Sequence, residues 1–197
     1  MKRWVMLSEL PAGDHPETSL AKLAALASGV HRCSVGAELP GSTGGLGAVW
    51  DVTAETVPAQ LISELPGTVD VVPLIPVAEQ IVPLDQPRRV KRTLLLTVRT
   101  GTTADAVAEF EQDLMGMPYH IGSIKSWALS RVGGDSRWTH CWEQEFTDPD
   151  GLNGEYLAHP YHWTSVDRWF DPEMPGAIVE PDIAHLYRWA SGPVLGV

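Results

Sequence analysis

Histidines and aromatic residues gather in the second half of the chain, where they could carry acid–base chemistry. The densest group is residues 156–162 (YLAHPYH), and a second group upstream is residues 138–142 (WTHCW). Alternation along a strand would place Trp138, His140 and Trp142 on one face. A histidine on a buried, aromatic-lined face can exchange protons near neutral pH. These residues therefore indicate a pocket for general acid–base catalysis.

Other chemistries fit the sequence less well. Imidazole is a zinc ligand, so His140, His159 and His162 could bind a metal, but no acidic or thiol ligand stands at a fitting spacing. The glycine-rich stretch 40–47 lacks the Gly-Lys-Ser/Thr ending of a phosphate-binding loop and opens a strand instead of a helix. No nucleophile elbow is present for a Ser-His-Asp triad. We therefore expect neither a metal nor an organic cofactor.

Charge and composition exclude several classes of partner. The 197 residues carry a net charge of −11 and show no basic stripe, which disfavours nucleic acid and acidic membrane surfaces. Two cysteines without metal spacing favour a reducing compartment. The apolar run near the N-terminus is too short for a signal peptide, and no stretch is long enough to span a membrane. These features predict a cytoplasmic protein that acts on a small molecule.

The first half of the chain reads as strand, helix, strand, strand, helix, strand. Asp14 can cap the first helix, and Pro16 fits its first turn. The last segment is rich in β-branched residues but interrupted by prolines, which predicts an irregular edge strand. The expected strands cover 4–7, 30–38, 47–53 and 69–82, and the expected helices cover 14–28 and 57–65.

The same order of elements begins again after a proline-containing linker at 83–89. Thr102 is expected to cap a helix with one apolar stripe, and the tail 191–197 is expected to be loose. Strands are expected at 90–99, 121–131, 138–146 and 178–189, and an irregular helical stretch at 148–170. The order predicts an α+β protein made of tandem ferredoxin-like βαββαβ repeats that form a pseudo-dimeric α/β barrel. The repeats would span 1–82 and 90–190, and higher oligomers stay open.

The second repeat resembles a stress-responsive A/B barrel (Dabb, dimeric α/β-barrel) domain. The resemblance rests on the opening strand 90–96 (VKRTLLL), on Thr139-His140, and above all on the 156–162 segment. The first repeat resembles this unit only in element order and lacks the His-Pro-x-His piece. Members of the family usually pair as homodimers, so the resemblance implies that this chain does within itself what two family chains do together.

The resemblance also implies roles for individual residues. In the polyketide cyclases of this family the second histidine of His-Pro-x-His is the base, and the preceding tyrosine positions the substrate. These residues match His162 and Tyr156, and His140 matches a histidine that lines the pocket. Arg92 replaces a family histidine on the first strand, and an inward-facing arginine could bind a carboxylate. The expected substrate-binding residues are Arg92, Trp142, His159 and Trp163.

These inferences predict a cofactor-independent acid–base enzyme for a small ketone- or phenol-bearing, polyketide-like substrate. Cyclisation, isomerisation and lysis share proton abstraction next to a carbonyl as their first step, so the sequence does not separate them. One alternative is a cofactor-free oxygenase of an aromatic polyketide, and another is a non-catalytic stress or ligand-binding protein. The pocket is expected in the second repeat, with the first repeat acting mainly as a scaffold.

Overall fold

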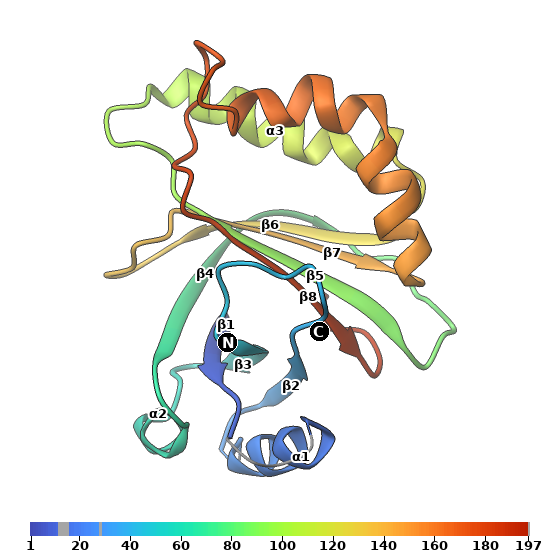
Figure 1. Cartoon of the computed structure of the whole chain (residues 1–197). Coiled ribbons are helices and arrows are strands. Elements are labelled where there is room, and N and C mark those ends of the chain that lie inside the picture. The colour runs from blue at the N-terminus through green and yellow to red at the C-terminus, as the bar shows by residue number, and fades with distance from the viewer. Residues whose placement is uncertain (12–15, 28, 197) are drawn as a thin grey trace.

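A computed structural model describes residues 1–11, 16–27 and 29–196 and shows the expected doubling of elements (Figure 1). The first repeat contains β1 (Lys2–Glu9), α1 (Pro16–Leu26), β2 (Arg32–Ala37), β3 (Gly47–Ala54), α2 (Ala59–Glu64) and β4 (Val69–Gln80). The second repeat contains β5 (Arg89–Leu96), α3 (Ala104–His120), β6 (Ser126–Val132) and β7 (His140–Phe146). It then continues through three short helices, η1 (Gly151–Tyr156), η2 (His162–Val166) and η3 (Asp167–Trp169), to β8 (Ala184–Ala190).

All eight strands form one antiparallel sheet in the order β2-β3-β1-β4-β6-β7-β5-β8. Within each repeat the fourth strand lies beside the first, followed by the third and the second, which is the ferredoxin-like order. β4 pairs with β6 and joins the repeats. Isolated bridges from Glu38 to Arg188 and from Thr43 to His185 draw the other two edges together. The sheet is therefore a nearly closed barrel, and the predicted fold class is confirmed.

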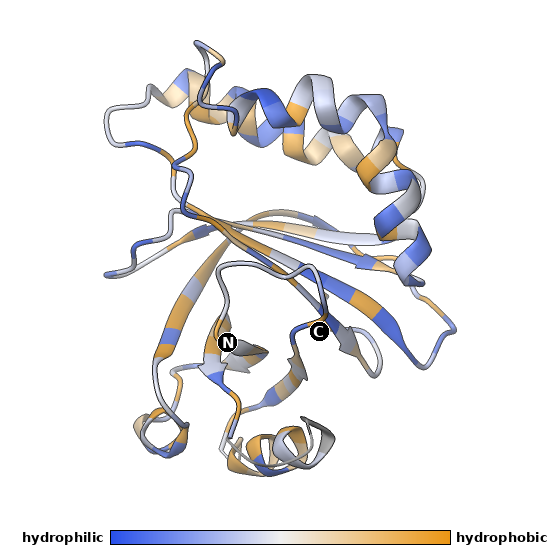
Figure 2. Ribbon diagram, viewed as in Figure 1, coloured by the Kyte–Doolittle hydropathy of each residue, from blue (hydrophilic) through white to orange (hydrophobic). Residues whose placement is uncertain are grey.

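Three hydrophobic clusters fill the spaces between these layers. One lies between the second half of the sheet and α3 with the helices that follow Phe146, and it includes Phe110, Trp142 and Tyr156. Another lies under α1 and α2 and includes Trp50. The third lies inside the barrel and includes Leu95. Hydrophobic residues accordingly run along the strands and along the helices that cover them (Figure 2).

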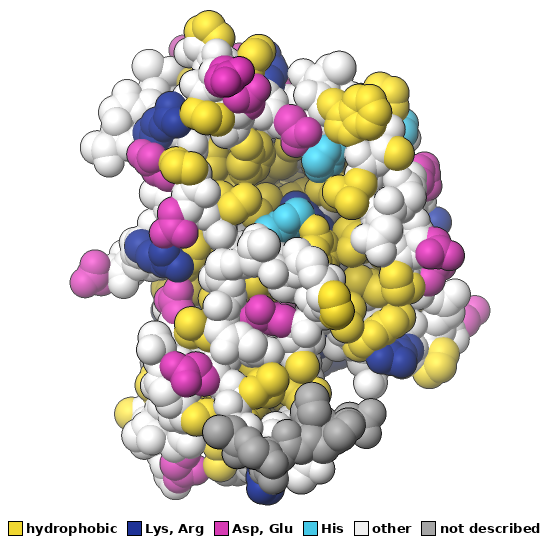
Figure 3. Space-filling view, in the orientation of Figure 1, with side chains coloured by type: hydrophobic (Ala, Val, Ile, Leu, Met, Phe, Trp, Pro, Cys, Tyr) yellow, Lys and Arg dark blue, Asp and Glu magenta, His cyan; other side chains and the backbone are white. Residues whose placement is uncertain are grey.

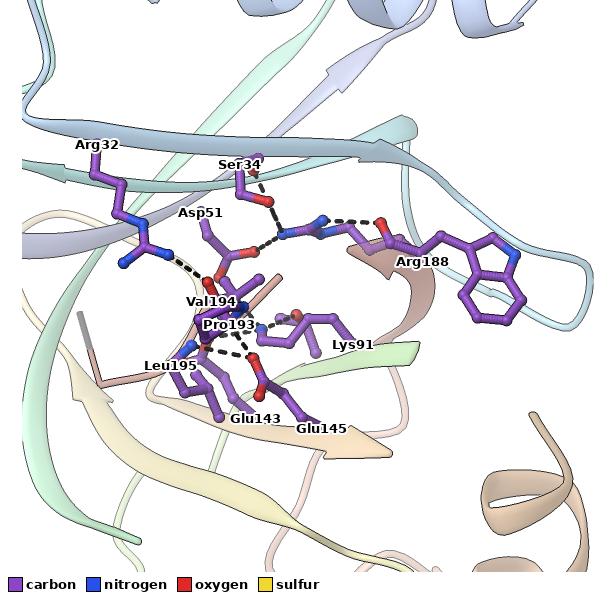
Figure 4. A network of polar contacts seen from close by, with 12 residues as sticks. Arg32, Ser34, Asp51, Lys91, Glu143, Glu145, Arg188, Pro193, Val194 and Leu195 are labelled. Carbon is purple, nitrogen blue, oxygen red and sulfur yellow. Dashed lines mark hydrogen bonds and ion pairs between the residues drawn. The ribbon is translucent and has the colours of Figure 1, made fainter. Parts of the chain in front are cut away.

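The barrel also encloses charged side chains contributed by both repeats. Lys91 Nζ lies 3.2 Å from Asp51 Oδ1 and 2.8 Å from Glu143 Oε1, and both the lysine and the glutamate have no exposed surface. Arg188 reaches Asp51 from β8 (Figure 4), and Arg3 Nη2 lies 2.8 Å from Glu143 Oε1. These five residues are called the barrel charge cluster below. Buried charges are stable only when they are paired and hydrogen-bonded, so the cluster holds β1, β3, β5, β7 and β8 in one arrangement.

Several local expectations need correction. β4 lies in the middle of the strand order, not at an edge. Its residues 69–74 pair with β1 and residues 74–80 with β6, and the register shifts between Pro76 and Ala78, which accommodates the prolines. Thr103, not Thr102, caps α3 by accepting a hydrogen bond from Ala106 N. The expected cap Asp14 lies outside the described residues, and the division of the chain at 83–89 stays a prediction.

The C-terminal tail is not loose, at least as far as residue 196. Val194 and Leu195 are buried, and their N–H groups donate to Glu145 Oε1 at 2.7 and 3.2 Å. Glu145 in turn pairs with Arg89 at 3.1 Å. The sequence suggested a loose end because this tail is short and rich in glycine. The buried carboxylate that holds it comes from a distant strand, and local composition does not reveal it.

The barrel charge cluster makes stability depend on Asp51. Burial alone would raise the pKa of Asp51, but attraction to Lys91, Arg188 and Arg3 outweighs burial and holds the pKa well below its usual range. Asp51→Asn should therefore lower the free energy of unfolding by about 3–5 kcal/mol, because it leaves buried cations without their partner. Urea denaturation measures the loss.

A matched control is Asp182→Asn, which removes an exposed carboxylate that pairs with Arg137. It should change stability little, because exposed pairs are screened by water. Because the pKa of Asp51 is depressed in the fold, its contribution is present above the unfolded pKa and is lost as the pH falls towards the folded value. Equal stabilities of the two variants at neutral pH would contradict this account.

Candidate functional site

A cavity of about 190 Å³ lies between the second half of the sheet and the helices that cover it. Its walls come from β5, β7 and β8 on one side and from α3 and the 156–170 region on the other. Figure 3 shows a hollow on this face in which histidine and basic side chains stand among hydrophobic ones. We call it the Arg92 cavity, and its lining residues are Arg92, Leu94, Leu114, Met117, Trp142, Tyr156, His162, Val166, Asp167, Phe170, Ile183 and His185.

Arg92 is held rigidly at the sheet side of the cavity. Its Nε donates to His185 Nε2 at 2.7 Å, and its Nη1 donates to Gln144 Oε1 at 2.8 Å. The guanidinium carbon lies 5.1 Å from the centre of the Tyr156 ring, within reach of a cation–π interaction. The side chain is only 3% exposed, and no described carboxylate lies within ion-pair distance of it. A buried cation thus faces the cavity with neutral partners only.

His185 is fixed as a neutral ring by this arrangement. Arginine cannot accept a hydrogen bond, so His185 Nε2 must be the acceptor and the ring proton must sit on Nδ1. The hydroxyl of Tyr187 lies within hydrogen-bond distance of both ring nitrogens, 3.1 Å from Nδ1 and 2.9 Å from Nε2. Burial, together with the charges of Arg92 and His162, lowers the pKa of His185 to about 2. His185 therefore positions Arg92 and does not serve as a proton donor.

His162 and Asp167 form a second polar pair at the more exposed end of the cavity. His162 Nδ1 lies 3.4 Å from Asp167 Oδ1, near enough for an ion pair when the ring is charged but not aligned for a hydrogen bond. The His162 side chain is 15% exposed and that of Asp167 is 49% exposed. No described residue bonds to His162 Nε2. An imidazole with a free nitrogen and a carboxylate beside the other nitrogen has the components of a general base.

Tyr156 lies between these two groups. Its ring meets the His162 ring edge-on, with the centroids 4.8 Å apart. Burial raises the pKa of Tyr156 to about 12, so the phenol stays protonated and can donate a hydrogen bond. Trp142 offers another donor, because its Nε1–H is buried and has no described partner. Tyr156 lies in η1 and His162 in η2. Both are short π-helices, a type of helix often found at functional sites.

The structure brings together four of the predicted site residues, Tyr156, His162, Arg92 and Trp142. It places three others elsewhere. His140 does not line the Arg92 cavity; its Nε2 lies 3.2 Å from Glu111 Oε1, and its Nδ1 lies 2.8 Å from the Thr139 hydroxyl. His159 Nδ1 accepts from Tyr161 N, and Trp163 is 56% exposed with its Nε1 bonded to Leu157 O.

The expected shared face on β7 is also smaller than the alternation suggested. Trp138 precedes the strand and joins the barrel interior, where its Nε1 donates to Asp70 at 2.7 Å. Burial lowers the pKa of His140, and the opposing attraction of Glu111 does not restore it. His140 thus forms its own cluster at another part of α3.

Sequence reasoning missed His185 and Asp167. His185 alternates with Tyr187 on the expected closing strand, which is a signal for two polar residues on one face. That His185 belongs to the cavity becomes clear only from the pairing of β8 with β5, which puts His185 opposite Leu94 and Tyr187 opposite Arg92. Asp167 follows η2 directly and meets His162 because the chain turns into a helix there.

The first repeat also contributes to the site through the 38–46 loop, which follows β2. Thr43 exchanges two backbone hydrogen bonds of 2.9 Å with His185, and the Ser42 hydroxyl accepts from Tyr187 N at 3.0 Å. Gly44 has a φ of +72°, and a Cβ there would overlap the carbonyl oxygen of Ile183. The 38–46 loop therefore runs along β8 and fixes the backbone of His185. The ring of His185 in turn accepts the hydrogen bond that positions Arg92. This support of the β8 backbone is compatible with the expected scaffold role of the first repeat, which stays a prediction.

The described residues contain no group of three or more histidine, cysteine, aspartate or glutamate side chains that could hold a metal ion. They also contain no helix long and apolar enough to cross a membrane. The expectation of a cofactor-independent site stays a prediction.

Comparison with known proteins gives one family match and several similar folds. Residues 90–180 match the model of the stress responsive A/B barrel domain. No curated protein matches the sequence. A crystal structure of a "putative monooxygenase" from Fusobacterium nucleatum superposes with a TM-score of 0.66 at 10% identity, over 96% of this chain and 92% of that one.

Two further structures share the architecture. One is an anthrone oxidase-like protein, with a TM-score of 0.63 at 6% identity, covering 96% of this chain and 90% of that one. The other is a major regulator of staphylococcal pathogenesis, with a TM-score of 0.55 at 11% identity, covering 98% of this chain and all of that one. Since these neighbours differ in described role and share little sequence, they show the fold alone.

The contact between the 38–46 loop and β8 can be tested at two glycines that both have positive φ. Gly41→Ala should lower the free energy of unfolding by about 1–2 kcal/mol, the cost of this backbone conformation for alanine, because no atom lies within 4 Å of the new Cβ. Gly44→Ala should cost clearly more and should shift the NMR signals of the His185 ring, because it displaces the loop from Ile183. Equal losses, with the His185 signals unmoved, would show that the loop does not position the site.

Proposed function

We propose, from the premise that residues 90–180 form a stress responsive A/B barrel domain, that the Arg92 cavity is the active site of a cofactor-independent acid–base enzyme. Its substrate would be a small ketone- or phenol-bearing molecule of polyketide-like character. The observation that carries the proposal is the pairing of a histidine that has a free nitrogen with a buried cation across one apolar cavity. This combination suits removal of a proton next to a carbonyl.

The proposed chemistry assigns a step to each group. His162 Nε2 takes a proton from a carbon beside a carbonyl, and the electrons of the broken C–H bond move onto the carbonyl oxygen. Asp167 stabilises the imidazolium from the Nδ1 side. The negative oxygen is stabilised by two donors already in place, the Trp142 N–H and the Tyr156 hydroxyl, and by the positive charge of Arg92 across the cavity. Return of the proton from His162 to a different carbon would complete an isomerisation. Attack of the carbanion on a second carbonyl forms a C–C bond and an alkoxide, and transfer of the proton from His162 to that alkoxide would complete a cyclisation.

A second candidate is a cofactor-free oxygenase. It is favoured by the fold shared with a protein described as anthrone oxidase-like and with one described as a "putative monooxygenase". The same deprotonation yields an electron-rich carbanion that O₂ can oxidise. For a methylene group the balance is one O₂ consumed, one oxygen atom retained as the new carbonyl, and the other released as water with the two methylene hydrogens.

We further propose a cytoplasmic location, supported by two cysteines that are not paired in a disulfide.

The proton-abstraction step can be tested before the natural substrate is known. With small aryl ketones in D₂O, the protein should accelerate incorporation of deuterium next to the carbonyl, as followed by mass spectrometry. His162→Ala should slow this exchange by about 10²–10⁴-fold, the usual contribution of a positioned base. His31→Ala changes an exposed histidine just before β2 and should leave the rate unchanged. Oxygen uptake with the same ketones would indicate the oxygenase.

Exchange that continues at the full rate in the His162→Ala protein would refute the proposed base. If the wild-type protein binds these ketones but accelerates neither exchange nor oxygen uptake, the non-catalytic binding role replaces the enzymatic one.

A further inference from the structure

We infer that the ligand of the Arg92 cavity is a small, flat, mainly apolar molecule that carries one carboxylate, and that this carboxylate binds Arg92. The inference deepens the proposed function and rests on it for the identity of the site. It adds a substrate class that the proton-abstraction chemistry alone does not require, because a neutral ketone could undergo the same first step.

The hydrogen bonds of Arg92 leave its outer edge free. A guanidinium has five N–H donors, of which one on Nε goes to His185 and one on Nη1 goes to Gln144. One N–H on Nη1 and both on Nη2 have no partner among the described residues. Donors on both terminal nitrogens are what a carboxylate needs for two parallel hydrogen bonds. The two occupied donors also fix the plane of the guanidinium, so little side-chain freedom is lost on binding.

The charge of Arg92 lacks a counterion in the protein. Burying a cation without an anion is costly, and every other buried arginine or lysine among the described residues has a carboxylate within 3.2 Å: Arg89 pairs with Glu145, Lys91 with Asp51 and Glu143, and Arg188 with Asp51. Among the residues that line the cavity, Asp167 is the acid, and its carboxylate lies against His162. An anionic ligand would supply the missing charge.

The rest of the cavity sets the size and polarity of the molecule. Apolar side chains cover most of the wall: Leu94, Leu114, Met117, Val166, Phe170 and Ile183. A dry cavity of about 150 Å³ is enough for benzene, so a volume of about 190 Å³ suits one substituted aromatic ring. Trp142 and Tyr156 add flat faces on which a ring can stack.

The two polar ends give the ligand one orientation. Arg92 is almost fully buried, whereas the Asp167 side chain is half exposed, so the positive charge marks the inner end and the negative charge the outer end. A carboxylate is attracted to the first and repelled by the second. The opposite end of the ligand is then presented to His162, as the proposed base requires.

Benzoate and benzamide provide a direct test, because they have nearly the same shape and differ in charge. Calorimetric titration of the wild-type protein near neutral pH should show benzoate binding about tenfold or more tightly than benzamide, as expected for charge-assisted hydrogen bonds. Arg92→Gln should remove this preference by weakening benzoate binding, with benzamide little affected. Arg92→Lys keeps the charge and should retain part of the preference.

Controls separate this inference from the proposed function. Arg137→Gln removes an exposed arginine on the outer surface and should leave both affinities unchanged. His162→Gln should lose deuterium exchange but keep the preference for benzoate. Equal binding of benzoate and benzamide by the wild-type protein would overturn the inference without touching the base. A preserved benzoate preference with full exchange in His162→Gln would instead refute the base and leave the carboxylate site standing.

Discussion

The barrel charge cluster constrains everything else in this fold. Arg3 and Asp51 come from the first repeat and Lys91, Glu143 and Arg188 from the second, and three of the ion pairs cross between the repeats: Arg3 with Glu143, Lys91 with Asp51, and Arg188 with Asp51. The cluster also fixes the register of β5. Because side chains alternate along a strand, Lys91 can face Asp51 inside the barrel only if its neighbour Arg92 faces the helices. One strand thus presents a compensated cation to the barrel and an uncompensated cation to the cavity.

Once the orientation of Arg92 is fixed, contacts from several other elements complete the cavity around it. The pairing of β8 with β5 brings His185 to Arg92, and the neutral ring of His185 orients the guanidinium without neutralising it. The 38–46 loop then holds the β8 backbone from the other repeat. Opposite the sheet, η1 and η2 carry Tyr156 and His162 to the same cavity. The proposed base and the proposed carboxylate-binding residue therefore come from different elements, which meet only in the folded chain.

The sequence predicted the repeat order, the barrel and four residues of the cavity, because those features leave local signals. Periodic apolar residues mark strands and helices, and the 156–162 segment is dense in titratable and aromatic side chains. What it could not reveal depends on contacts between distant strands. His185 appeared isolated because its partner stands 93 positions away. His140 carries the same local signal as His162, yet Glu111 of α3 draws it into another cluster. β4 looked like an edge because its prolines lie where its pairing passes from β1 to β6.

The two junctions of the barrel differ, and that difference has a consequence for how such a protein can evolve. A dimer of identical chains has two equivalent seams, so any change made at one is imposed on the other. Here β4 and β6 pair along a ladder from Leu74 to Gln80 with one shift of register, whereas β2 and β8 meet through isolated bridges and the 38–46 loop. Joining the repeats in one chain has broken the twofold symmetry. Residues at the β4–β6 junction can therefore change without altering the β2–β8 junction, which lies beside His185 and the proposed ligand site.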